Sequence, residues 1–148
     1  MKNIIVALDF SQVTKKMIEN TITLYENMHC KVWLLHVALP HPDLKQYEEK
    51  AYTKAMREKM AEIYSHEHMQ LQNCAKELRA KDVETEALMI QGNTADTIIK
   101  KAEELQANFI VIGSHGHGAL HKMLLGSVSE AVLSKANCPV ILIPSRHT

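Results

Sequence analysis

The sequence lacks the charge bias, the paired cysteines and the long apolar run that mark several classes of protein. Lysine plus arginine equals aspartate plus glutamate at 17 each, and no basic run stands out, so nothing favours nucleic acid or anionic lipid. The three cysteines, Cys30, Cys74 and Cys138, form no CxxC pair, so neither a zinc knuckle nor a redox couple is indicated. We expect buried or half-buried thiols in a reducing compartment. The apolar run in MKNIIVALDF is five residues long, too short for a signal peptide or a membrane span, so we expect a cytoplasmic protein.

Glycine and proline are also scarce. The chain has five glycines and four prolines, and neither occurs between Asp43 and Gln91. Hydrophobic residues make up 46% of the sequence and charged residues 23%, which is an ordinary globular composition. Because the chain has 148 residues and no repeat, low-complexity tract or linker, we expect one domain over residues 1–148.

Apolar segments alternate with helical patterns along the chain. The segment IIVAL is continuously apolar, which indicates a strand buried on both faces, as in parallel sheets. Strand and helix patterns repeat four times and close with a strand, so we expect an open parallel α/β sheet with helices on both faces. The expected strands are residues 2–8, 31–37, 83–90, 109–113 and 139–143. The first expected helix follows an N-cap at Ser11, and the second spans about 44–79 with an interruption near 65–68. The third runs from Asn93 or Thr94 to about Gln106, and the fourth spans 127–136.

The segment 113–128, GSHGHGALHKMLLGSV, holds four of the five glycines. It begins at the carboxyl end of the fourth expected strand, where open α/β sheets bind ligands. Ser127 and Glu130 have the spacing of a capping box, which predicts a helix N-terminus with unpaired amides and a partial positive charge. Because glycine costs conformational entropy on folding, four glycines in one segment need a structural or functional reason. Turns account for one or two of them. Their position between a buried strand and a capped helix favours a phosphate cradle.

Other ligand motifs are absent or incomplete. The chain has no GxxxxGK[ST] segment, and Gly116-x-Gly118 lacks the third glycine of GxGxxG and follows the wrong strand for a dinucleotide site. His115, His117 and His121 form HxHxxxH. Two histidines four residues apart share a metal only on a helix, which the glycines oppose, and no acidic or cysteine partner is near. We therefore expect no metal site.

Four residues elsewhere have plain structural interpretations. Asp9 can cap the turn after the first strand, although its place at a strand's carboxyl end favours a ligand contact. His36 lies inside an expected buried strand and should be a core histidine with a hydrogen-bonding neighbour. Met56 and Met60, at helical spacing, are expected to fill the core.

The spacing Gly113-x2-Gly116-x9-Gly126-Ser127 resembles the G-2x-G-9x-G-[S/T] signature of the ATP-binding branch of the universal stress proteins. IIVALDFS at the start, LLHV in the second strand and GSVSEAVLSKANCPVILIP at the end resemble that family in the same order, so the resemblance covers the whole chain. It implies a Rossmann-like five-stranded parallel sheet of order 3-2-1-4-5. Asp9 and the glycine segment would then face each other across one crevice.

The resemblance also implies residue roles. Asp9 would contact the ribose or the metal–phosphate end of ATP, with Mg²⁺, and Val37 would meet adenine through its backbone. Amides of Gly116, Gly126, Ser127 and Val128, with the Ser127 hydroxyl, would hold phosphates. The implied nucleotide-binding set is Ala7, Leu8, Asp9, Val37, Gly113, Ser114, His115, Gly116, His117, Gly126, Ser127 and Val128, with Gly113 and Ser114 by the ribose. Members commonly form homodimers through the last strand, here residues 139–143, whose edge is otherwise unpaired.

His117 departs from the family pattern, because many members carry arginine at this position. A histidine facing phosphate predicts tighter nucleotide binding at pH 6 than at pH 8. The expected function is an ATP-binding, stress-response regulatory homodimer, and the alternative is a slow ATPase or nucleotide-processing enzyme on the same fold. Binding is favoured over turnover, because the sequence offers no P-loop lysine, no obvious arginine finger and no clear general base near the glycines.

Overall fold

The computed structural model describes residues 1–40, 54–114 and 125–145, and its sheet has five strands in the order β3-β2-β1-β4-β5. Each neighbouring pair of strands is parallel. This arrangement confirms the expected open α/β sheet and the strand order that the family resemblance implied. The elements are β1 (Lys2–Ala7), α1 (Thr14–Asn27), β2 (Cys30–Ala38), α2 (Lys54–Arg79), β3 (Thr85–Gln91), α3 (Thr94–Glu104), β4 (Phe109–Gly113), α4 (Ser127–Lys135) and β5 (Val140–Ile143).

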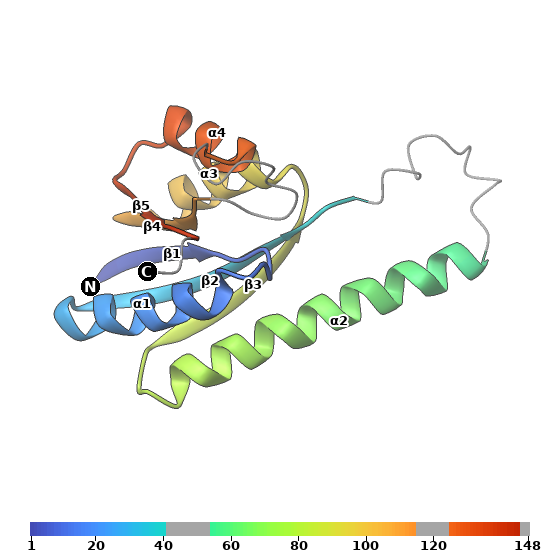
Figure 1. Cartoon of the computed structure of the whole chain (residues 1–148), viewed down its shortest axis with the longest axis horizontal. Coiled ribbons are helices and arrows are strands. Elements are labelled where there is room, and N and C mark those ends of the chain that lie inside the picture. Colours follow the sequence, from blue (N-terminus) through green and yellow to red (C-terminus); the bar gives the residue numbers. More distant parts are fainter. Residues whose placement is uncertain (41–53, 115–124, 146–148) are drawn as a thin grey trace.

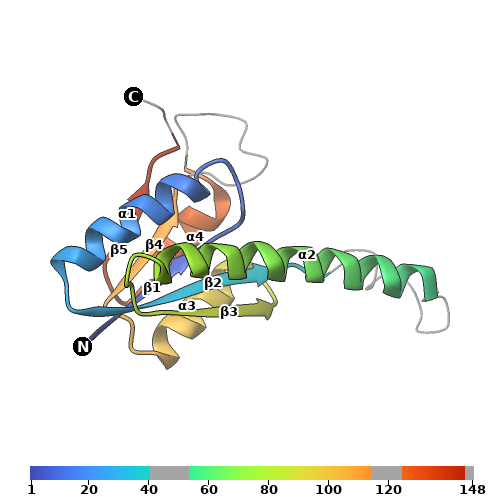
Figure 2. The ribbon, with the colours of Figure 1, turned by 90° about the horizontal axis from the view of Figure 1, so that it is seen from below.

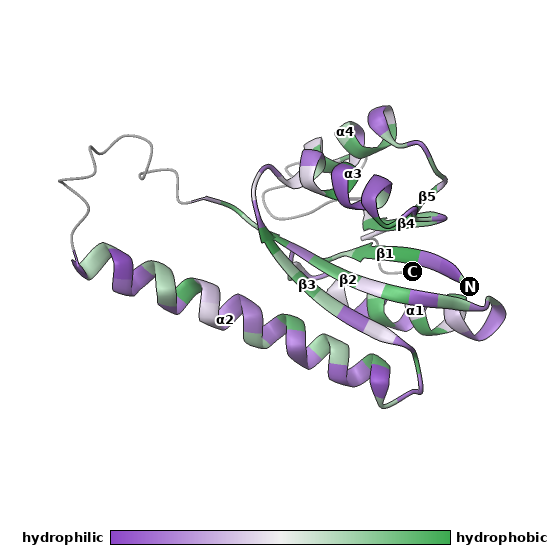
Figure 3. Ribbon diagram, turned by 180° about the vertical axis from the view of Figure 1, so that it is seen from behind, coloured by the Kyte–Doolittle hydropathy of each residue, from purple (hydrophilic) through white to green (hydrophobic). Residues whose placement is uncertain are grey.

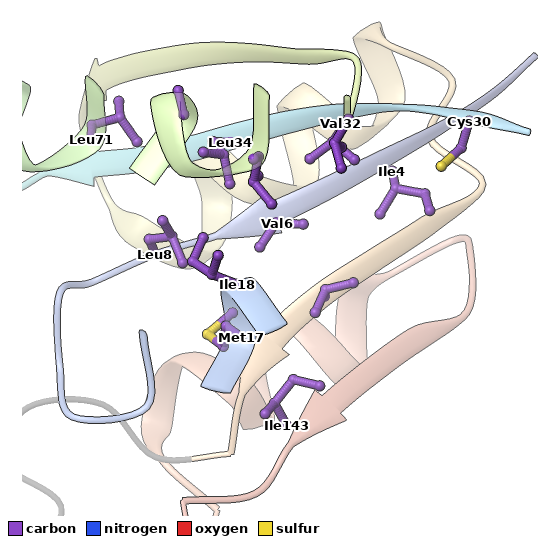
Figure 4. Close-up of a cluster of buried hydrophobic side chains, with 14 of the residues drawn as sticks. Ile4, Val6, Leu8, Met17, Ile18, Cys30, Val32, Leu34, Leu71 and Ile143 are labelled. Atoms are coloured by element: carbon purple, nitrogen blue, oxygen red, sulfur yellow. The ribbon is translucent and has the colours of Figure 1, made fainter. Parts of the chain in front are cut away.

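Helices cover both faces of the sheet (Figure 1), with α1 and α2 on one face and α3 and α4 on the other. Side chains of a strand point alternately to its two faces, so β1 contributes Ile4 and Val6 to one core and Ile5 to the other. In the first core, Leu71 of α2 and Ile18 of α1 approach the sheet residues Val6 and Leu34 (Figure 4). Burial on both faces is the reason that the strands read as continuous apolar runs.

Most element boundaries lie within two residues of the expectation, and β4 matches it. Asn93 caps α3 as expected, since its side-chain oxygen accepts a hydrogen bond from the Asp96 amide at 3.0 Å. The expected cap at Ser11 is wrong. Val13 is the N-cap of α1, and the Ser11 amide donates instead to the Asp9 carboxylate at 2.9 Å. Ser11 therefore belongs to the turn before the helix.

Helix α2 differs most from the expectation. It is continuous through residues 65–68, so the expected interruption is wrong. The first part of the expected helix, residues 44–53, lies outside the described residues. Its buried residues, Leu71, Ala75 and Leu78, all lie in its second half. The first half projects beyond the sheet (Figures 1 and 2) and has a mixed, largely hydrophilic surface (Figure 3). Met56 and Met60 lie on that half, are half-buried, and belong to neither core cluster of the described residues, so the structure does not support their expected place in the core.

The part of the chain that the structure describes contains no helix long and apolar enough to cross a membrane. All three cysteines are free, with Cys30 buried and Cys74 and Cys138 half-buried, which confirms the expected burial of the thiols.

Burial raises the pKa of all three thiols above the ordinary value, and the negative charges of Glu84 and Glu77 add to this at Cys30 and Cys74. The folded protein therefore keeps its thiol protons to higher pH than the unfolded chain does. Their contribution to stability is complete below the ordinary thiol pKa and is lost as pH rises through the raised values. We expect the stability advantage of the native chain over Cys30→Ala, measured by urea unfolding, to be smaller at pH 10 than at pH 8. An advantage that does not change with pH would contradict this linkage.

Candidate functional site

The strand order reverses between β1 and β4, which are hydrogen-bonded neighbours at the centre of the sheet. After β1 the chain enters α1 on one face, and after β4 it enters α4 on the other (Figure 1). Open α/β sheets usually bind ligands in a crevice at such a reversal, beyond the carboxyl ends of the two strands. The sequence-predicted residues Asp9, Gly113 and Ser114 lie at these two strand ends.

The turn after β1 is built around Asp9. The Leu8 amide still donates to the Leu35 carbonyl of β2 at 2.8 Å, so the sheet guides the chain up to the residue before Asp9. The Asp9 carboxylate then accepts from the Ser11 amide at 2.9 Å, which confirms the turn-capping interpretation. Between them, Phe10 has a φ of 60°, a left-handed conformation that costs energy for a residue with a side chain. The turn at the carboxyl end of β1 therefore contains one strained residue, Phe10.

The two ends of the glycine segment are joined at Ser114. The Gly126 amide donates to the Ser114 carbonyl at 2.9 Å, although 12 positions separate these residues. The Ser114 amide in turn donates to the Ile143 carbonyl of β5 at 2.9 Å, and its hydroxyl accepts from the Ser145 amide at 3.3 Å. Ser114 thereby fixes the start of α4 against the carboxyl ends of both β4 and β5. Sequence reasoning placed Ser114 near the ribose but did not foresee this structural role.

Ser129 strengthens the same junction. It is buried, and its hydroxyl donates to the Gly113 carbonyl at 2.7 Å with a longer contact of 3.3 Å to the Ser114 carbonyl. The sequence pattern of the segment GSVSE predicted roles for Gly126, Ser127, Val128 and Glu130 but none for Ser129. The signal available in the sequence was a serine two positions after the start of the expected helix.

Replacing Ser129 with alanine should lower the free energy of unfolding by about 1–2 kcal/mol, because the half-buried Gly113 carbonyl loses the Ser129 hydroxyl as a hydrogen-bond donor. The matched control is Ser134→Ala on the same helix, where the lost hydrogen bond to the Ala131 carbonyl is exposed, and we expect a change below about 0.5 kcal/mol. Urea denaturation measures both. Equal effects of the two substitutions would show that Ser129 does not anchor the helix.

The expected capping box at Ser127 and Glu130 is wrong. Gly126 is the N-cap of α4, the Glu130 amide donates to the Gly126 carbonyl at 3.0 Å, and no side chain caps the helix. Because Ser127 and Val128 occupy the first two helical positions, their amides have no acceptor within the helix. Both residues are exposed. The Gly126 amide is already bonded to Ser114, so its part in an anion site would be the lack of a side chain.

The remaining predicted residues divide into two groups. Ala7 ends β1, Leu8 is buried directly after it, and Val37 is buried near the end of the neighbouring strand β2. His115, Gly116 and His117 lie outside the described residues, as does the rest of the HxHxxxH segment. Within the described ranges, no three histidine, cysteine or acidic residues are grouped to hold a metal ion.

His36 is a buried titratable residue of β2, the strand that pairs with β1. Its two ring nitrogens have partners at 2.8 and 3.0 Å, the Leu8 carbonyl and the Glu67 carboxylate. The expectation of a core histidine with a hydrogen-bonding neighbour is therefore confirmed.

These features define a doubly wound α/β protein whose candidate site lies where the strand order reverses. The model of the universal stress protein family matches residues 1–144, and the chain belongs to this family. A universal stress protein of Thermus aquaticus is 29% identical over 144 residues, which cover 96% of this chain and 98% of the relative.

Solved structures agree with this assignment. The structure of MJ0577, a universal stress protein of Methanocaldococcus jannaschii, has 27% identity and a TM-score of 0.83, with 99% of this chain and 98% of that chain covered. Two more distant structures share the fold and were solved with adenine nucleotides. One is an Archaeoglobus fulgidus family member in complex with dAMP, with 22% identity, a TM-score of 0.67 and coverage of 97% and 98%. The other is a universal stress protein in complex with cAMP, with 18% identity, a TM-score of 0.69 and coverage of 98% of both chains.

Proposed function

We propose that this protein binds an adenine nucleotide, specifically ATP with Mg²⁺, in the crevice between the β1 and β4 connections, and acts as a cytoplasmic stress-response regulator. The observation that carries the proposal is the hydrogen bond between the Gly126 amide and the Ser114 carbonyl. It holds the N-terminus of α4 at the carboxyl end of β4, which lies beside the end of β1 that precedes Asp9. The dAMP and cAMP complexes of family members support the nucleotide class.

Each part of the nucleotide has a matching group in this proposal. The amides of Ser127 and Val128 and the Ser127 hydroxyl would donate to phosphate oxygens, which the partial positive charge of the helix N-terminus also attracts. Asp9 would contact the ribose or the Mg²⁺ held by the phosphates, since carboxylate oxygens suit this cation. Val37 would meet adenine through its backbone. Gly113 and Ser114 would lie by the ribose, and His115, Gly116 and His117 complete the proposed set.

A thermal-shift series tests the ligand. A ligand that binds only the folded state raises the unfolding midpoint, so ATP, ADP, AMP, NAD and Zn²⁺ are compared, each with and without Mg²⁺. We expect stabilisation by adenine nucleotides, largest with ATP and Mg²⁺. Stabilisation by NAD or Zn²⁺ alone, or by none of the ligands, would contradict the proposal.

Regulation by binding, rather than catalysis, is the proposed activity. Phosphoryl transfer needs charge neutralisation and a positioned nucleophile, and the sequence offers no P-loop lysine and no clear general base near the glycines. We therefore expect ATP to raise the unfolding midpoint while phosphate release stays at the background rate. Release that rises in proportion to enzyme concentration and disappears in the Gly126→Val variant would favour the slow ATPase instead.

The proposal includes a homodimer formed through β5. In the part of the chain that the structure describes, this strand lies at the edge of the sheet with β4 as its one strand neighbour, and Val140, Ile141 and Leu142 are half-buried. The Ile143 carbonyl accepts from the Ser114 amide just after β4, and backbone groups of successive strand residues point to opposite sides, so those of Leu142 point to the open edge.

Leu142→Pro should therefore convert the dimer to a monomer, because proline removes an amide that faces the partner strand. Leu142→Ala keeps that amide and is the matched control. Light scattering after size-exclusion chromatography measures the mass of each variant. A dimeric proline variant, or a monomeric native protein, would contradict a dimer through β5.

A further inference from the structure

One imidazole joins the turn that carries Asp9 to the long helix α2. His36 of β2 is buried, with 6% of its surface exposed. Its Nδ1 lies 2.8 Å from the Leu8 carbonyl oxygen, and its Nε2 lies 3.0 Å from Oε2 of Glu67 on α2. Its ring also contacts Phe10, with ring centroids 4.5 Å apart and planes tilted by 39°. His36 therefore contacts the Asp9 turn at two residues and α2 at one.

Two of these contacts hold the residues directly before and after Asp9 in the sequence. Leu8 and Phe10 are its two sequence neighbours, and His36 holds the first by a hydrogen bond and the second by its ring. Phe10 has a φ of 60°, so its backbone is in a conformation that needs support from its surroundings. A shift of His36 would change the position of Asp9 without any direct contact between the two side chains.

The Leu8 side of this cluster has a fixed hydrogen-bond direction. A carbonyl oxygen only accepts hydrogen bonds, so Nδ1 of His36 donates to Leu8. The contact of 3.0 Å between Nε2 of His36 and Oε2 of Glu67 is the polar link to α2.

Glu67 stands at a particular place on α2. The buried residues of the helix, Leu71, Ala75 and Leu78, all follow it, and the half before it projects beyond the sheet (Figure 2). The Tyr64 hydroxyl adds one exposed contact of 3.3 Å to the Leu39 carbonyl, just past the end of β2. The His36–Glu67 pair therefore lies at the boundary between the packed half of α2 and its projecting half.

We propose that His36 is a positioning residue that couples the nucleotide crevice to helix α2, through Leu8 and Phe10 on one side and Glu67 on the other. The coupling rests on the proposed nucleotide function. A ligand that contacts Asp9 and fixes its turn also fixes His36, which strengthens the attachment of Glu67 and reduces opening of α2 around it. Binding in the crevice thereby changes a helix whose projecting half is exposed to other molecules.

Three substitutions separate the two sides of the cluster. His36→Asn places an amide donor near the position of Nδ1 and so keeps the bond to Leu8, but it is too short to reach Glu67. Glu67→Ala keeps His36 on Leu8 and removes only the link to α2. His36→Phe keeps a ring against Phe10 and removes both polar contacts. Glu77→Ala, an exposed change in the packed half of α2, is the matched control for Glu67→Ala.

Calorimetry with ATP and Mg²⁺ and amide hydrogen exchange over α2 are the two measurements. We expect Glu67→Ala and Glu77→Ala to bind ATP within about threefold of the native affinity. His36→Asn, which loses the ring against Phe10, should bind less tightly than these two, and His36→Phe should bind at least about 10-fold more weakly than the native protein. ATP should slow exchange around residues 63–70 in the native protein and in Glu77→Ala, but not in His36→Asn or Glu67→Ala. An ATP effect on α2 that persists in Glu67→Ala would overturn the coupling. Native affinity in His36→Phe would overturn the positioning role.

The experiment also separates this proposal from the nucleotide function. If the native protein binds no adenine nucleotide, the proposed function and the coupling fail. The positioning role is then decided by exchange of the 10–13 amides without ligand, which should be faster in His36→Phe than in the native protein and native-like in Glu67→Ala. Should His36→Phe not fold, the same comparison is made with His36→Ala, and equal exchange in all variants overturns the role.

Discussion

Replacing Gly126 with valine is expected to weaken ATP binding by about 100-fold, because the branched side chain would stand in front of the first amides of α4. Two charge-assisted hydrogen bonds lost at about 1.5 kcal/mol each correspond to a factor of this size. The backbone at Gly126 has φ −66° and ψ 158°, an extended conformation that valine adopts readily. The loss therefore reports blocked access to phosphate rather than backbone strain. Calorimetry at fixed Mg²⁺ concentration measures the affinity.

Two further variants make the Gly126 experiment interpretable. Ser127→Ala removes one hydroxyl and leaves the amides in place, so we expect a smaller loss of about 5–10-fold. Leu133→Val changes an exposed residue near the other end of α4 and should leave the affinity unchanged. Unfolding curves show whether each variant is folded. A folded Gly126→Val protein with native affinity would place the phosphates elsewhere.

Leu34→Ala should lower the free energy of unfolding by about 2–5 kcal/mol, the usual range for removing a large aliphatic side chain from a packed core. Leu34 is fully buried in the cluster formed by the sheet with α1 and α2, and it approaches Leu71 of α2 (Figure 4). Thermal unfolding should show a midpoint lower by about 6–15 °C for a domain of this size.

Leu133→Ala is the matched control for Leu34→Ala, because it deletes the same atoms from a residue that is 40% exposed. We expect its cost to stay below about 1 kcal/mol. If the two variants lose the same stability, the first core cluster is not the main source of stability on that face of the sheet.

The class of fold was predictable from the sequence because its signals are local. Continuous apolar runs such as IIVAL and FIVIG identified buried parallel strands, and Asn93 marked the start of α3 by a hydrogen bond three residues along the chain. The strand order came from the family resemblance, since local patterns do not say which strands are neighbours. The structure confirms all of these predictions.

Most of the wrong predictions involve contacts between distant segments, whereas the Ser11 cap fails because of a contact only two residues away. Ser127 had the spacing of a helix cap, but the long-range bond from the Gly126 amide to the Ser114 carbonyl placed the cap at Gly126. Ser11 was predicted to cap the first helix, but its amide donates a hydrogen bond to the Asp9 carboxylate in the turn before that helix. Met56 and Met60 had the spacing of a core stripe, yet the sheet ends before it reaches their half of α2. A local pattern cannot show which surface, if any, will cover it.

The sequence by itself determined where the strands and most helices form, because main-chain hydrogen bonding and apolar periodicity act over a few residues. Tertiary structure alone decided the geometry of the candidate site. The Ser129–Gly113 and His36–Glu67 contacts join residues 16 and 31 positions apart, and the His36–Leu8 contact joins residues 28 positions apart. Such pairs become neighbours only after the sheet has formed, since the parallel strands bring their carboxyl ends together at one edge.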